Sequence, residues 1–208
     1  MRKKKFYFIV FEGVEGTGKS YQINKLYKNL KNKKFEVIKT REPGGSQTAE
    51  KIRNLIFSKT SNKFDKLTDF YLMCAARNEH VKKKLLIAKK KKQVVICDRF
   101  TDSTYAYQVI GNKINNKLNV INQEHILNGL KSNLTIVLKS DFKTIFSRIK
   151  KRKKTNKFDK LKINFYTKAQ KAYLKKANNN NDYYVFDSSK NTTDLEKKIF
   201  RLIIGKLK

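Results

Sequence analysis

One stretch of the chain has the residue types and the spacing needed to hold a row of phosphates. Residues 13–20 read GVEGTGKS and match the pattern G-x-x-x-x-G-K-[ST]. Glycines let backbone N–H groups come close to phosphate oxygens, and a helix that begins here points its positive end at the same anion. Lys19 reaches the outer phosphates, and the Ser20 hydroxyl can ligate Mg²⁺. The predicted phosphate-binding residues are Gly13, Val14, Glu15, Gly16, Thr17, Gly18, Lys19 and Ser20.

The segments on either side of this loop support the prediction. Residues 6–11 form an apolar run typical of a buried parallel strand, and residues 21–31 place apolar side chains at helical spacing. Strand, loop and helix in this order are the context that the motif needs. The alternative is a chance match in a loop that contains glycine and lysine.

A second strand, predicted at residues 35–40, leads into the sequence REPGG, in which Pro43 is the only proline of the chain. A proline followed by two glycines makes a stiff turn with a defined backbone path. The turn either connects a strand to a helix or forms a ligand loop at the carboxyl end of the strand. The two interpretations are compatible.

A third predicted strand, at residues 93–97, ends in Asp98 and Arg99. An acid at this point, at the same sheet edge as the phosphate loop, can reach Mg²⁺ or its water ligands. The arginine beside it can fork onto a phosphate. The alternative is a helix-capping acid followed by a surface arginine, but the convergence of three strand ends favours the ligand site.

The helix predicted at residues 102–110 has one polar face. Thr104, Tyr107 and Gln108 stand at i, i+3 and i+4, so they lie on the same side of the helix. A hydroxyl, an aromatic ring and an amide together could contact a base edge and stack on a sugar or a base.

The rest of the chain continues the alternation of strands and helices. Further helices are predicted at residues 47–57, 65–84, 120–130, 141–151, 159–177 and 195–207, and further strands at residues 134–138 and 183–187. This order predicts an α/β fold: a three-layer α/β/α arrangement with a five-stranded parallel sheet, of the P-loop nucleotide kinase type. A length of 208 residues without an internal repeat indicates one domain over residues 1–208.

The formal net charge of +33 is the most unusual feature of the composition. Such a charge is typical of proteins that bind nucleic acid or an anionic membrane. The lysines are abundant everywhere, including helix faces such as residues 82–84 and 89–92, which favours a general drift of composition over a dedicated patch. We therefore expect no dedicated nucleic-acid or membrane partner.

A basic segment at residues 150–157 reads KKRKKTNK and is too charged to bury. It is either a tail for nucleic acid or a short basic lid, at about residues 150–158, that closes cations over a transferring phosphate. The phosphate loop favours the lid. Cys74 and Cys97 have no metal-ligand spacing and no segment has transmembrane length, so the sequence predicts a cytoplasmic protein.

Taken together, these motifs resemble those of the bacterial thymidylate kinases over nearly the whole chain. The shared segments are FEGVEGTGKS at residues 11–20, TREPGG at 40–45, AAR at 75–77 and DRFTDSTYAYQ at 98–108. The phosphate loop alone does not choose among nucleotide kinases, whereas the second and fourth segments together are much more specific.

The resemblance implies transfer of the γ-phosphoryl group of ATP to dTMP, giving dTDP for dTTP synthesis and DNA replication, with Mg²⁺ as cofactor and a homodimer as the assembly. The implied ATP contacts are residues 13–20 with Arg148, Arg152, Asp187 and Ser188. The implied dTMP contacts are Glu12, Glu15, Arg41, Pro43, Met73, Arg77, Arg99, Thr104, Tyr107 and Gln108. The implied metal ligands are Ser20, Asp98 and Glu15, and the implied catalytic residues are Lys19, Glu15, Arg99, Arg152 and Arg148, with Glu15 between donor and acceptor.

In this arrangement Arg77 and Arg99 hold the phosphate and sugar side of dTMP. Thr104 and Gln108 face the thymine, and Tyr107 crowds the 2′ position, which favours deoxyribose. A nucleotide phosphate has a second pKa of about 6 and is already ionised near neutral pH, so it needs no general base. Alignment of two anions and stabilisation of charge are the remaining tasks.

The loop of this chain lacks an arginine, and such members resemble a subclass that supplies the arginine from the lid. Arg152 is therefore the expected transition-state arginine, with Arg148 as the second choice. The chain departs from the family at Lys157, where arginine is usual, at Met73, where a phenylalanine usually stacks on thymine, and at Tyr21, where threonine is common. The alternatives are another nucleoside monophosphate or deoxynucleoside kinase, and a nucleic-acid-binding protein that uses nucleotide as a switch.

Overall fold

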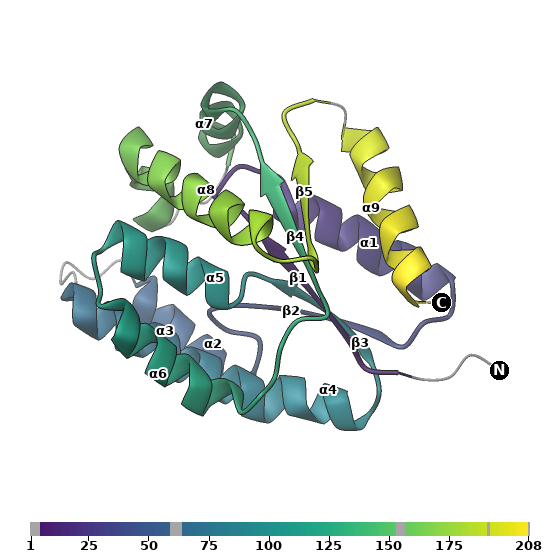
Figure 1. Cartoon of the computed structure of the whole chain (residues 1–208), viewed down its shortest axis with the longest axis horizontal. Helices are drawn as coiled ribbons and strands as arrows, with labels where there is room; N and C mark the ends of the chain where they lie inside the picture. The colour runs from purple at the N-terminus through teal and green to yellow at the C-terminus, as the bar shows by residue number, and fades with distance from the viewer. Residues whose placement is uncertain (1–4, 59–63, 153–156, 191, 208) are drawn as a thin grey trace.

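A computed structural model of the protein describes residues 5–58, 64–152, 157–190 and 192–207 (Figure 1). Residues 153–156 of the expected lid lie outside the described residues. Five parallel strands form one sheet in the order β2-β3-β1-β4-β5. The strands are β1 (Tyr7–Glu12), β2 (Val37–Arg41), β3 (Val94–Asp98), β4 (Leu134–Lys139) and β5 (Tyr183–Asp187). The predicted α/β fold with a five-stranded parallel sheet is confirmed.

Helices cover both faces of the sheet (Figure 1). Side chains alternate along each strand, so Ile9 and Phe11 pack toward α1 (Lys19–Asn32) and α9 (Thr192–Leu207), while Phe8 and Val10 face the opposite layer. That layer contains α2 (Gln47–Ile56), α3 (Lys66–His80), the π-helix η1 (Val81–Leu85), α4 (Leu86–Lys90), α5 (Thr101–Thr104), the π-helix η2 (Tyr105–Gly111), α6 (Asn116–Leu127), α7 (Phe142–Lys150), the 3₁₀-helix η3 (Lys157–Lys160) and α8 (Ile163–Asn178).

Several helix boundaries differ from the sequence predictions. The helix expected to end at residue 84 continues through η1 and α4 to Lys90. The helix expected from residue 120 begins at Asn116, because the Asn115 side chain accepts a hydrogen bond from Lys117 N at 2.8 Å and caps a polar first turn. Apolar periodicity could not detect that turn. Within the described part of the chain, none of the helices combines the length and apolarity needed to cross a membrane.

The register of the sheet brings three strand ends to one edge. Phe11 of β1 pairs with Asp98 of β3, and Asp98 pairs with Arg41 of β2. The segments that follow these strands therefore start side by side, as expected for parallel strands. The loop after β1, the turn after β2 and the helix after β3 form the functional site described next.

Candidate active site

The phosphate loop runs from the end of β1 into the first turn of α1. Gly16 has a φ of 76°, and a Cβ there would lie 2.7 Å from Ile145 O, so both the backbone angle and the space require glycine. Lys19 Nζ donates to Gly13 O at 2.7 Å and to Val14 O at 2.9 Å. The ammonium is thereby held over the loop, at the amino end of the helix, where an anion is favoured.

The environment of Lys19 weakens its hold on a proton. Its side chain is buried, and burial, followed by the nearby positive charge of Arg99, lowers its pKa to about 8. The carboxylates of Asp98 and Glu15 act in the opposite direction. A bound polyphosphate would add negative charge beside this amine and favour its charged form.

Ser20 and Asp98 together offer the oxygen ligands that Mg²⁺ prefers. Ser20 Oγ donates to Asp98 Oδ2 at 3.1 Å. Asp98 Oδ1 is buried and has no hydrogen-bond partner among the described residues, which leaves a carboxylate oxygen available for a cation or its water. No group of three or more His, Cys, Asp or Glu side chains forms a metal site in the described residues. One carboxylate and one hydroxyl fit an ion whose other ligands are phosphates and water.

A partly open cleft lies beside the phosphate loop, and its empty space, open solvent at the mouth included, is about 390 Å³. Its walls come from the loop, the turn after β2, α3, the segment from β3 to η2, and η3. The lining residues are Glu15, Glu42, Pro43, Met73, Arg77, Arg99, Phe100, Ser103, Thr104, Tyr107, Gln108 and Phe158. Eight of the ten residues predicted to contact dTMP are among them: Glu15, Pro43, Met73, Arg77, Arg99, Thr104, Tyr107 and Gln108.

Glu15 joins the phosphate loop to this cleft. Arg99 Nη2 donates to Glu15 Oε1 at 2.7 Å, and the Tyr107 hydroxyl donates to Glu15 Oε2. Burial opposes ionisation of Glu15, but the charges of Arg99 and then Lys19 hold its pKa below the ordinary value. Burial, and then the Glu15 charge, raise the pKa of Tyr107 well above its ordinary value, so the phenol keeps its proton and remains a donor.

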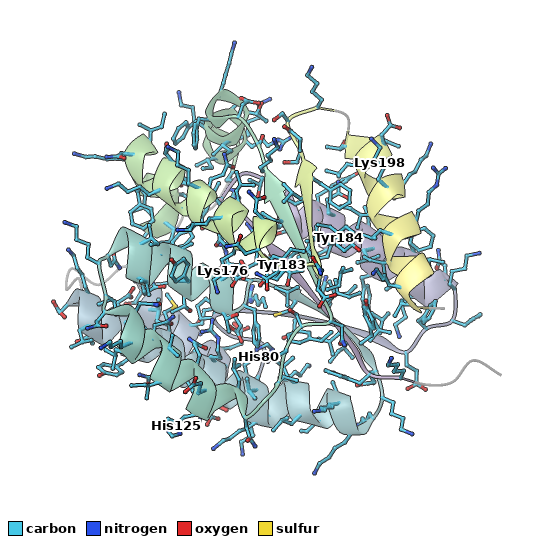
Figure 2. All side chains as sticks on the ribbon, in the orientation of Figure 1. His80, His125, Lys176, Tyr183, Tyr184 and Lys198 are labelled. Atoms are coloured by element: carbon cyan, nitrogen blue, oxygen red, sulfur yellow. The ribbon has the colours of Figure 1, made fainter. Side chains whose placement is uncertain are left out.

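A buried network fixes Arg77 at the opposite wall. Arg77 Nε donates to Glu42 Oε2 at 2.7 Å, and Arg77 Nη2 donates to Phe100 O at 2.8 Å. Glu42 also meets His80 Nδ1 at 2.9 Å, and His80 Nε2 meets Thr40 Oγ1 at 2.7 Å. Figure 2 shows His80 within the protein and His125 on the outer side of α6. His80 therefore positions the arginine through Glu42.

Two buried donors of the cleft remain without partners. Arg77 Nη1 and Gln108 Nε2 have no hydrogen-bond partner within the part of the chain that the structure describes. Unsatisfied buried donors are costly, so such groups in a cleft indicate a ligand that supplies acceptor oxygens. A phosphate and a pyrimidine base carry such oxygens.

Comparison with known proteins identifies the family. A family model described as thymidylate kinase matches residues 11–199. The thymidylate kinase of Hahella chejuensis is 32% identical over 205 residues, which are 98% of this chain and 99% of that protein. The thymidylate kinase of Aster yellows witches'-broom phytoplasma is 36% identical over 97% of this chain and 96% of that protein. The crystal structure of thymidylate kinase from Ehrlichia chaffeensis has a TM-score of 0.77 and 27% identity, and covers 98% of this chain and 100% of that one.

The chain belongs to the thymidylate kinase family. Its members are transferases, and phosphorylation of dTMP to dTDP is the activity that this membership carries. The resemblance drawn from the sequence motifs is thus confirmed.

Two of the residues that the family resemblance assigned to dTMP do not reach the cleft. Glu12 is fully buried behind it, where its carboxylate accepts hydrogen bonds from Phe100 N at 2.8 Å, Ser103 N at 3.2 Å and Ser103 Oγ at 2.6 Å. Arg41 points to the opposite side of β2 from Thr40 and forms an ion pair with Glu50 at 2.7 Å. Alternation places Arg41 on the face of β2 that is turned away from the cleft, whereas Glu12 lies on the cleft face of β1 and is covered by the segment that contains Phe100 and Ser103.

The two arginines that the thymidylate kinase resemblance placed in the lid have different partners. Arg148 Nη1 donates to Gly16 O at 3.2 Å and Nη2 to Ser188 O at 2.8 Å, so this side chain links the phosphate loop to the segment after β5. Arg152 Nη1 donates to Asp159 Oδ1 at 2.6 Å. Asp187, the residue before Ser188, accepts a hydrogen bond from Ser189 N at 2.8 Å, and its side chain is exposed.

Sequence reasoning did not assign several residues of this thymidylate kinase site. Glu42 belongs to the shared TREPGG segment, but its partners lie on other elements and no local pattern names them. Phe158 lines the cleft from the segment that the sequence predicts to be a basic lid over the transferring phosphate. Arg53 of α2 donates to Pro43 O at 2.6 Å, and burial, followed by the charge of Arg41, lowers its pKa to about 10. Its side chain thus supports the turn that carries Pro43.

Proposed function

We propose that the chain transfers the γ-phosphoryl group of ATP, held by residues 13–20, to dTMP bound in the cleft. The observation that carries this proposal is the pair of unpartnered donors, Arg77 Nη1 and Gln108 Nε2, in a cleft that shares Glu15 with the phosphate loop. The amide of Gln108 suits a carbonyl oxygen of thymine, and the guanidinium groups of Arg77 and Arg99 suit the phosphate and sugar side.

The site supplies alignment and charge without a general base. The dTMP phosphate is ionised near neutral pH because its second pKa is about 6. Lys19 and Arg99 offset the repulsion between two anions, and Glu15 orients Arg99 and Tyr107 through its two oxygens. Mg²⁺, with Ser20 and Asp98 as its protein contacts, would neutralise charge on the ATP phosphates.

Arg152 is the proposed source of positive charge at the transferring phosphoryl group. Both terminal nitrogens of Arg148, Nη1 and Nη2, donate to carbonyls beside the phosphate loop, which suits a role in holding ATP. Arg152 carries a side chain that is 38% exposed and can exchange Asp159 for a phosphate.

A coupled ADP-release assay with dTMP, dUMP, dCMP, dGMP, AMP and thymidine tests the substrate. We expect the highest kcat/KM with dTMP and dependence on Mg²⁺. Preference for a purine nucleotide would point to another nucleoside monophosphate kinase, and preference for thymidine to a nucleoside kinase. Negligible ADP release together with tight, salt-sensitive binding of DNA or RNA would favour the nucleic-acid-binding alternative.

The assembly is proposed to be a homodimer formed through α2, α3 and α6. Large apolar side chains are exposed on these helices: Leu55, Leu67, Tyr71, Val120 and Ile121. Exposed apolar side chains gathered on neighbouring helices are typical of an interface. Light scattering coupled to size exclusion tests the assembly, and a monomer at micromolar concentration would contradict it.

A further inference from the structure

A buried carboxylate of α3 meets a cation from η3. Asp69 lies in the first turn of α3, and its side chain is only 9% exposed. Lys157 Nζ donates to Asp69 Oδ1, from a side chain that is 39% exposed. A buried carboxylate without a cation beside it destabilises the protein, because its charge is then neither hydrated nor paired. The ion pair therefore favours the position of η3 seen here.

The residue after Lys157 lies at the wall of the cleft. The Phe158 ring packs edge-on against Tyr107, with ring centroids 5.2 Å apart, and against Phe57 of α2, with centroids 5.7 Å apart. The Tyr166 hydroxyl donates to Phe158 O at 2.7 Å. Phe158 thus depends on contacts with α2, η2 and α8 and is next to the ion pair with α3.

This position connects the ion pair to the reacting end of the cleft. Phe158 touches Tyr107, and the Tyr107 hydroxyl donates to Glu15 of the phosphate loop. A shift of η3 would therefore remove one wall of the cleft and one of the rings that pack on Tyr107. The same shift would separate Lys157 from Asp69.

We infer that Asp69 and Lys157 are positioning residues whose ion pair holds Phe158 against Tyr107 and so completes the binding cleft for the acceptor nucleotide. This inference rests on the proposed function, because it assigns the cleft to the acceptor. Acceptor binding and the ion pair favour the same position of η3, so each strengthens the other. Loss of either charge weakens acceptor binding and leaves ATP binding nearly unchanged.

Charge removal and charge exchange test the pair by kinetics. In Asp69→Asn and in Lys157→Met we expect the KM for dTMP to rise about tenfold, while the KM for ATP changes less than about twofold. The exchanged variant, D69K with K157D, should regain most of the affinity for dTMP. Lys162→Met is the matched control, since it removes one positive charge from an exposed position nearby and should behave as the wild type.

Two kinetic results would overturn the inference. One is independence of the two sites. In that case the rise in the KM for dTMP in the double variant, D69N with K157M, equals the product of the two single rises, whereas a coupled pair gives a rise no larger than either single one. The other is an equal rise in both KM values. If the exchanged variant fails to fold, the comparison of single and double neutral variants still decides between coupling and independence.

A fluorescent reporter tests the position of residue 158 without catalysis. The chain contains no tryptophan, so Phe158→Trp introduces a single tryptophan at the cleft wall, which can be excited selectively over the tyrosines. We expect its emission to shift to longer wavelength when Asp69→Asn is added, and to shift back on addition of dTMP. Emission that is unchanged by Asp69→Asn contradicts the inference that the ion pair holds residue 158 in place. A wild-type chain inactive with dTMP would instead contradict the proposed function, and the response of the reporter to Asp69→Asn would still be measurable.

Discussion

The donor and acceptor halves of the proposed site are built in different ways. The proposed donor half is centred on one stretch of eight residues whose backbone would do most of the binding, with glycines at positions such as Gly16, where no side chain fits. The acceptor half is assembled from five segments, and its groups are side chains held by other side chains, as in the Arg77–Glu42–His80 network. A local backbone site can be recognised from a short motif, whereas an assembled site depends on packing between distant segments.

Replacement of Lys19 by methionine is expected to damage the donor half most. Methionine keeps most of the length of the side chain but removes the charge and the donors that Lys19 directs over the loop. We expect kcat to fall by more than about 10³-fold, because this charge acts on the phosphates as they react. Steady-state ADP release measures the loss. Titration calorimetry should show dTMP affinity near that of the wild type, and a large loss there would mean that the halves are not separable.

Replacement of Arg152 by alanine tests the lid contribution to the donor half. We expect kcat to fall by about 10²- to 10³-fold with a nearly unchanged KM for dTMP, because the arginine is proposed to act on charge that develops during transfer. Arg148→Ala is the matched comparison and should mainly raise the KM for ATP. If Arg148→Ala caused the large loss in kcat while Arg152→Ala remained near wild type, the two roles would have to be exchanged.

The same difference explains what the sequence could and could not predict. The phosphate loop, the parallel sheet and the strand ends at Asp98 and Arg99 follow from contiguous patterns and from the rule that parallel strands end at one edge. The partners of Glu12 and Arg41 do not, because they depend on how the segment after β3 and helix α2 pack against these strand ends. The role of Phe158 depends on the packing of η3 against α2 and η2, and no periodicity in the sequence encodes that contact.

A smaller effect is expected when the acceptor half loses one contact. In Gln108→Met the side chain keeps its approximate size but cannot donate from the position of Nε2, which is buried and unpartnered in the described residues. We expect the KM for dTMP to rise about 10- to 30-fold and the KM for ATP to stay constant, because a hydrogen bond to the base is lost. Steady-state kinetics with each substrate varied measures both constants. A parallel rise in the KM for ATP would show that Gln108 supports the whole site.

The last predicted effect is on stability and concerns the support behind the acceptor half. Burial, and then the charge of Asp102, raise the pKa of Glu12 from 4.5 to about 7. Because the folded-state pKa is the higher one, the stabilisation by Glu12 is complete below the unfolded pKa and is lost as the pH rises through about 7. Glu12→Gln should remove this loss, because glutamine does not ionise. The difference in unfolding free energy, wild type minus variant, should therefore fall by on the order of 2 kcal/mol between pH 5 and pH 8. Urea unfolding at several pH values measures it, with the exposed Glu124→Gln as the control that shows no such trend. A constant difference between wild type and Glu12→Gln across this range would mean that Glu12 stays ionised, with its hydrogen bonds from Phe100 and Ser103 outweighing burial.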